Sequence, residues 1–94
     1  MAKLLVVDDE NNLRLVVQKE LSRLGHEVET ASDGEKAWQI LEHQDFDVLL
    51  CDINMPRLDG ISLLRRLREK RQNPPEVIML TGHATVETAI EAMK

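Results

Sequence analysis

Residues 3–9 read KLLVVDD: four apolar residues in a row are followed at once by two acids. An unbroken apolar run of this length is typical of a parallel strand that is buried on both faces of its sheet. The same design returns in FDVLLCD at residues 46–52 and, after the helix-breaking pair at residues 74–75, in the run from Val77 to Leu80. These stretches predict three buried parallel strands.

The segment after the first strand has helical periodicity. Asn11 or Asn12 is the expected N-terminal cap, and Gly25 is the expected stop. Between them, five apolar residues are predicted to share one face of the helix: Leu13, Val16, Val17, Leu21 and Leu24. We therefore predict an amphipathic helix that packs this face on the sheet.

The rest of the chain continues the alternation of strand and helix. Residues 26–31 alternate apolar and charged side chains, which indicates a more exposed edge strand. Ser32 and Glu35 have the spacing of a capping box that opens a second helix, and residues 61–71 are predicted as a third. The last helical face follows the final strand and contains Val86, Ala89, Ile90 and Met93. Strand and helix repeated four times predict an α/β fold, a doubly wound parallel sheet with right-handed crossovers, in one domain.

Length and composition exclude several classes of protein. The chain has 94 residues, 12 Lys+Arg and 17 Asp+Glu, which gives a formal charge of −5. The single cysteine, Cys51, cannot form an internal disulfide, so a disulfide-stapled secreted scaffold is excluded. The apolar runs are too short for a signal peptide or for the roughly 18 residues of a membrane span. We expect a cytoplasmic domain with no membrane partner and, because the basic residues at 65–71 interleave with leucines, no direct nucleic-acid partner.

Acids follow the buried strands at the end where such sheets bind ligands. Asp8 and Asp9 follow the first strand, Asp52 ends the second and Thr81 follows the third. Converging carboxylates repel one another unless a cation neutralises them, and Mg²⁺ is the divalent ion that such oxygen ligands suit. One carboxylate could then attack phosphorus to give an aspartyl phosphate, with Thr81 bonded to a phosphoryl oxygen. The alternative is that these acids are solvated loop starts.

Three stretches carry a resemblance to a known family: VVDDE at 6–10, LCDINMPRLDG at 50–60 and MLTGHA at 79–84. In order and spacing they resemble the receiver domain of two-component response regulators, over the whole chain. The resemblance implies a flavodoxin-like receiver fold with its strands in the order 2-1-3-4. The run TGHATVETA at 81–89 is further similar to receivers of sigma-54-dependent transcription activators, which implies an output domain in a longer parent protein.

The resemblance also implies roles for individual residues. Asp52 would be the phosphoacceptor, taking its phosphoryl group from a sensor histidine kinase in a Mg²⁺-dependent reaction. Mg²⁺ would be held directly by Asp9 and Asp52 and by the backbone carbonyl of Asn54, with Asp8 acting mainly through water. Thr81 would be the switch hydroxyl that moves towards the phosphoryl group and changes a partner-binding surface.

Receivers of this family also have a fifth strand and a fifth helix, with an active-site lysine, and the chain ends at Lys94 before them. We therefore expect residues 1–94 to be a truncated receiver whose competence for phosphorylation is the open question. An uncovered Val77–Leu80 edge, or the sheet face beside it, would favour a homodimer or higher oligomer. The alternative function is a phosphorylation-incompetent interaction or dimerisation module. A phosphatase with an aspartate nucleophile is disfavoured, because Asn54 stands where such an enzyme needs a second acid.

Overall fold

The computed structural model describes residues 1–52 and 58–80. These residues form an alternating series of strands and helices: β1 (Lys3–Val7), α1 (Asn11–Arg23), β2 (Glu27–Ala31), α2 (Gly34–His43), β3 (Val48–Asp52), α3 (Gly60–Lys70) and β4 (Glu76–Leu80). The helix predicted around residues 86–93 lies outside the described residues. Among the residues described, no helix is long and apolar enough to cross a membrane.

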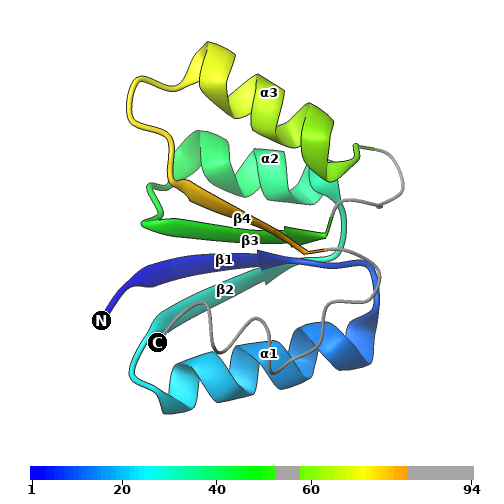
Figure 1. Cartoon of the computed structure of the whole chain (residues 1–94), viewed down its shortest axis with the longest axis vertical. Helices are drawn as coiled ribbons and strands as arrows, with labels where there is room; N and C mark the ends of the chain where they lie inside the picture. The colour runs from blue at the N-terminus through cyan, green and yellow to red at the C-terminus, as the bar shows by residue number, and fades with distance from the viewer. Residues whose placement is uncertain (53–57, 81–94) are drawn as a thin grey trace.

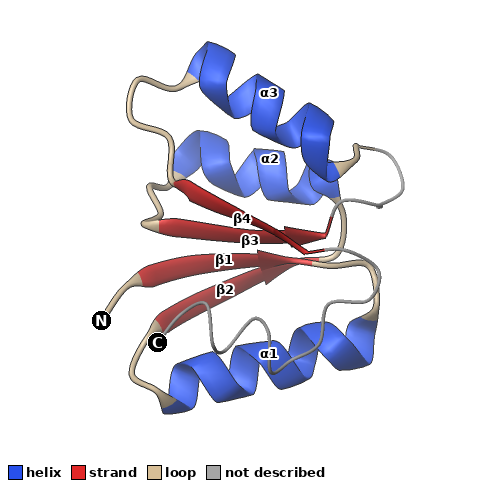
Figure 2. Ribbon diagram, in the orientation of Figure 1, coloured by secondary structure: helices blue, strands red, loops and turns tan. Residues whose placement is uncertain are grey.

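The strands form one parallel sheet in the order β2-β1-β3-β4, which confirms the predicted order. Figures 1 and 2 show the sheet between two layers, with α1 on one face and α2 and α3 on the other. The chain steps from β1 outwards to β2 and then returns to the other side of β1 as β3. The direction of winding therefore reverses between β1 and β3, which is where doubly wound sheets bind their ligands.

The apolar runs of the strands do not alternate because each strand supplies two cores. Leu5 and Val7 point to the side of α2 and α3, and Leu4 and Val6 point to the side of α1. All four side chains are at most 2% exposed. The runs in β1 and β3 are therefore strands buried on both faces, as predicted. The run from Val77 is also a strand, but Val77, Ile78 and Met79 are only half-buried, because β4 is at the edge of the described sheet.

The helix caps differ from the sequence-based expectation. Helix α1 is capped by Glu10, whose carboxylate accepts the backbone N–H groups of Asn12 (3.1 Å) and Leu13 (2.9 Å), and not by Asn11 or Asn12. Helix α2 is capped by Asp33, which accepts the N–H of Lys36 at 2.8 Å, and not by Ser32. An ionised carboxylate makes a stronger bond to an N–H group than a neutral amide or hydroxyl does, and its charge is favoured at a helix N-terminus.

The apolar face of α1 is also narrower than predicted. Val17 and Leu21 are buried, whereas Val16 is 44% and Leu24 39% exposed. Val16 is one residue from Val17, about 100° around the helix, so both cannot face the sheet squarely. The predicted stop is confirmed: Gly25 has a φ of +96°, a conformation that glycine adopts without steric cost.

Candidate functional site

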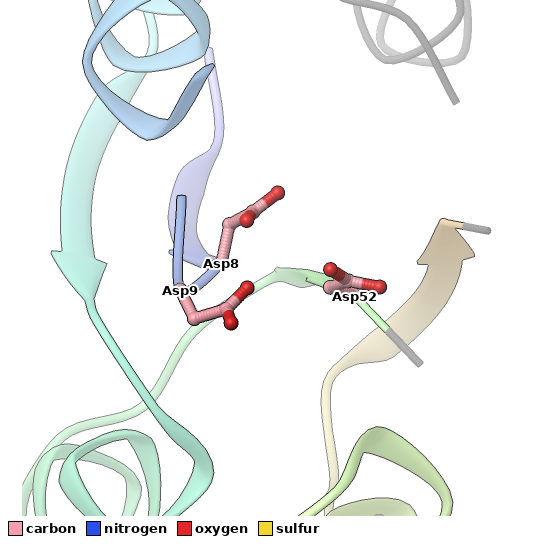
Figure 3. A group of neighbouring side chains, drawn as sticks. All are labelled: Asp8, Asp9 and Asp52. Atoms are coloured by element: carbon pink, nitrogen blue, oxygen red, sulfur yellow. The ribbon is translucent and has the colours of Figure 1, made fainter. Parts of the chain in front are cut away.

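The register of the sheet brings two of the predicted acids together. Val7 of β1 is paired with Cys51 of β3, so the next residues, Asp8 and Asp52, leave their strands side by side. Asp9 follows Asp8 in the turn that leads to α1. Figure 3 shows the three carboxyl groups gathered at the carboxyl end of the sheet, and oxygen atoms from all three lie within 4.8 Å of one another.

The three carboxylates differ in exposure to solvent. Asp8 is only 5% exposed, Asp52 is half-buried and Asp9 is exposed. The cluster is therefore closed on the side of Asp8 and open on the side of Asp9. A ligand that approaches from solvent can reach it without unfolding of the sheet.

The backbone around Asp8 is fixed by three hydrogen bonds. Its N–H donates to the carbonyl of Ala31 at 3.2 Å, and its side-chain Oδ1 accepts the N–H of Glu10 at 2.9 Å. Its carbonyl oxygen accepts a hydrogen bond from Arg14 Nη1 at 2.7 Å. The arginine thus bonds to the backbone oxygen of Asp8, while the carboxylate faces the other acids.

Burial and like charge act together on the titration of Asp8. Desolvation makes the largest contribution to the raised pKa of Asp8, and the neighbouring charges of Asp52, Asp9 and Glu10 raise this pKa further. The hydrogen bond from the Glu10 N–H acts in the opposite direction and lowers it. Burial in the core likewise raises the pKa of the Cys51 thiol to about 12, with smaller contributions from nearby carboxylates. The thiol is fully buried, as expected for a strand residue that points away from the site.

The chemistry of this donor set fits a hard divalent cation. Carboxylate oxygens are the preferred ligands of Mg²⁺, which uses few carboxylates and keeps several waters. A divalent ion would also remove the repulsion that raises the pKa of Asp8, since a bound cation reverses the local electrostatics. The cluster of Asp8, Asp9 and Asp52 is thus a candidate metal site.

Two predicted site residues, Asn54 and Thr81, lie outside the described residues. Leu58, which follows residues 53–57, is buried, and Asp59 caps α3 by accepting the N–H of Ser62 at 2.8 Å. Hydrogen bonds from the backbone and side chain of Ser62 lower the pKa of Asp59. The roles of Asp59 and Arg14 beside the site were not predicted, because a cap and a bond to a backbone carbonyl depend on where the chain turns.

Comparisons with known proteins show the family to which this chain belongs. Residues 4–94 match the family model described as the response regulator receiver domain. A chemotaxis protein CheY homolog of Campylobacter jejuni is 42% identical over 96 residues, covering 96% of this chain and 74% of the relative. The regulatory protein AtoC of Escherichia coli is 38% identical over 92 residues, which cover 98% of this chain and 20% of AtoC.

Solved structures give the same result. The response regulator protein TrrA of Thermotoga maritima, determined in complex with Mg(2+)-BeF, is 34% identical with a TM-score of 0.81. The match covers 89% of this chain and 72% of TrrA. From sequence motifs, strand order and structural neighbours alike, this chain belongs to the response regulator receiver domain family.

Proposed function

We propose that this chain is a phosphorylatable receiver in a two-component pathway, with Asp52 as the phosphoacceptor. The single observation that carries the proposal is the position of Asp52: its carboxylate lies beside those of Asp8 and Asp9 where the winding of the sheet reverses. A sensor histidine kinase would be the phosphoryl donor. The reaction is a transfer, so the phosphorus–nitrogen bond of the donor breaks as the phosphorus–oxygen bond to Asp52 forms.

The residues proposed to hold Mg²⁺ are Asp9 and Asp52 directly, the backbone carbonyl of Asn54, and Asp8 mainly through water. When bound, Mg²⁺ would neutralise charge on the transferred phosphoryl oxygens. The chain's own residues supply the geometry. Asp52 is the last residue of β3, and Asp8 is held in place by the hydrogen bond that its N–H donates to the Ala31 carbonyl and by the one that its side chain accepts from the Glu10 N–H. The match to TrrA, which was solved in complex with Mg(2+)-BeF, supports this assignment.

We propose Thr81 as the switch hydroxyl, because it follows β4 directly in the sequence. A new dianionic group on Asp52 offers acceptor oxygens to a hydroxyl at this end of the sheet. This hydrogen bond would shift the equilibrium between two conformations of a surface. The shift in free energy cannot exceed the difference in contact energy between the two conformations. An output domain or a partner protein would bind that surface.

Phosphorylation is tested by the intact mass of the protein after incubation with Mg²⁺ and acetyl phosphate. We expect one phosphoryl adduct, which disappears in Asp52→Asn and when the metal is chelated. Asp47→Asn is the matched control, because Asp47 directly precedes the same strand at its opposite end. An adduct that persists in Asp52→Asn would refute the acceptor, and Mg²⁺ binding without any adduct would favour the interaction module.

We further propose that the chain self-associates through β4. In the described part of the sheet β4 is an edge strand, and its residues Val77, Ile78 and Met79 are half-buried. An apolar edge strand offers unpaired backbone groups to another chain. Sedimentation velocity at tens of micromolar should show a dimer or larger species, and a single monomeric boundary would refute the association.

A further inference from the structure

Arg14 of α1 is bonded directly to the backbone of the acidic cluster. Its Nη1 atom donates to the carbonyl oxygen of Asp8 at 2.7 Å, and its Nη2 atom donates to the side-chain oxygen of Asn11 at 2.6 Å. Arg14 is half-buried, so its guanidinium group is partly shielded from water. One planar group therefore links the residue that follows β1 to the first residue of α1.

The carbonyl group of Asp8 belongs to the peptide group that joins Asp8 to Asp9. Because a peptide group is planar, the direction of this carbonyl fixes the direction in which the chain enters Asp9. Two other bonds hold Asp8 itself, through its N–H to Ala31 at 3.2 Å and through its Oδ1 to the N–H of Glu10 at 2.9 Å. The bond from Arg14 acts on the peptide group that connects the two acids.

The bonding of Arg14 is suited to orienting the chain. Both acceptors are neutral oxygens, one of a carbonyl and one of an amide, so these two bonds are not ion pairs. The positive charge of the guanidinium group opposes the binding of a cation nearby. Loss of Arg14 would thus strengthen Mg²⁺ binding through charge alone and weaken it through loss of orientation, and the two effects have opposite signs.

We propose that Arg14 is a positioning residue of the acidic cluster: its two hydrogen bonds hold the peptide group between Asp8 and Asp9 and thereby aim both carboxylates into the cluster. This inference rests on the proposed function, because it takes the clustered carboxylates as the Mg²⁺ site. Loss of groups that orient metal ligands typically costs 10-fold to 100-fold in affinity. Arg14→Met should therefore raise the Kd for Mg²⁺ by about 10-fold.

The experiment is a Mg²⁺ titration followed by the backbone amide NMR signals of the three clustered aspartates, which needs no phosphorylation. Arg23→Met is the matched control, because Arg23 is the last residue of the same helix, bonds to Glu20 at 2.8 Å and has a side chain that is 67% exposed. Both variants lose one positive charge. Only Arg14→Met should raise the Kd for Mg²⁺.

Arg14→Lys separates the hydrogen bonds from the charge. An ammonium group keeps the positive charge but lacks the planar fork that reaches two acceptors at once. If orientation decides the affinity, one restored bond should give a Kd between those of the wild type and Arg14→Met. A Kd above that of Arg14→Met would contradict the inference, since it would show that the charge of residue 14 decides the affinity.

The inference and the proposed function fail in different ways. A Kd for Arg14→Met that is equal to or below that of the wild type would overturn the inference and leave the proposed function intact. A wild-type protein that binds no Mg²⁺ would instead overturn the proposed function, and the inference with it.

A second measurement serves if Arg14→Met does not fold. Coupling between two sites is reciprocal, so if the bond from Arg14 to Asp8 supports Mg²⁺ binding, Mg²⁺ must stabilise that bond. In the wild type, the side-chain N–H protons of Arg14 should exchange with water more slowly when Mg²⁺ is added, and those of Arg23 should not change. Unchanged exchange at Arg14 would contradict the proposal.

Discussion

The two ends of the sheet use aspartate in opposite ways. At the amino end, Asp47 accepts the N–H of Lys3 at 2.8 Å with its side chain and the N–H of Glu76 at 3.0 Å with its carbonyl. It thereby joins the starts of β1 and β4 to β3. At the carboxyl end, the oxygens of Asp8 and Asp52 face each other and Asp9 across less than 5 Å. Acids that bond to N–H groups stabilise the fold, whereas clustered acids oppose it, so the second group is the one that points to function.

The carboxyl end is also where the helices begin, and this makes a cluster of acids tolerable there. Glu10, Asp33 and Asp59 each accept N–H groups at the start of a helix. The same partial positive charge of the helix N-termini favours anions close by. This end of the sheet is therefore suited both to carboxylates and to a phosphoryl group that would join them.

The largest expected difference between the ends is in metal affinity. Asp9→Asn removes one of the three clustered carboxylates and should weaken Mg²⁺ binding by more than about 10-fold, because even the loss of groups that only orient metal ligands costs that much. Asp47→Asn changes the net charge equally and should leave the Kd unchanged. Isothermal titration with Mg²⁺ on both variants measures this, and equal losses would mean that net charge, not the cluster, binds the ion.

The next effect is on stability at the amino end. Arg71 follows α3 and donates to the carbonyl of Leu41 at 2.6 Å, near the end of α2, and it also pairs with Asp45. Arg71→Ala should lower the free energy of unfolding by about 2 kcal/mol, since the bond from a charged donor is lost and the carbonyl is left without it.

Asp45→Ala is the control for that ion pair. The Asp45 side chain is 90% exposed, so its removal should cost about 0.5 kcal/mol or less. Urea unfolding of the two variants separates the contributions. Equal losses would show that the ion pair, not the bond to the Leu41 carbonyl, holds α3 to α2.

A smaller loss is expected for Asp47→Ala, which removes the side-chain acceptor of the Lys3 N–H. A single exposed hydrogen bond of this kind contributes about 1 kcal/mol. Urea unfolding should show this loss without any change in Mg²⁺ affinity. A loss of Mg²⁺ affinity would mean that a change at the starts of β1 and β3 alters the acidic cluster at the ends of these strands.

The sequence allowed the strands and the acidic end to be predicted because both depend on local pattern, whereas the order of the strands followed from the resemblance to the receiver family. Apolar runs mark strands buried on both faces, and acids directly after such runs must meet at one end of a parallel sheet. The caps at Glu10 and Asp33 were missed, since neighbouring polar residues compete and the turn of the chain decides between them. Gly34 lies so close to the backbone of Leu58 that a Cβ at residue 34 would be 1.9 Å from the Leu58 carbonyl oxygen. This contact joins residues far apart in the sequence and leaves no local signal.

The smallest effect is the dependence of stability on pH, and it has opposite signs for two acids at the same end. The raised pKa of Asp8 means that the metal-free native state binds more protons than the unfolded state above the ordinary value of 3.8. The free energy of unfolding therefore falls as pH rises through that window. Asp8→Asn should become more stable than the wild type over the same window in the presence of a chelator.

Asp59 should behave in the opposite way, because hydrogen bonds from Ser62 lower its pKa below 3.8. Its contribution is complete above the ordinary value and is lost as pH falls through the lowered pKa. An NMR titration of the side-chain carboxyl carbons should place the midpoint of Asp8 above 3.8 and that of Asp59 below it. If Mg²⁺ is then added, only the Asp8 midpoint should fall, since the ion neutralises the cluster and does not act on a helix cap. A shift of both midpoints would mean that Mg²⁺ acts on the whole acidic end and not at the three clustered carboxylates.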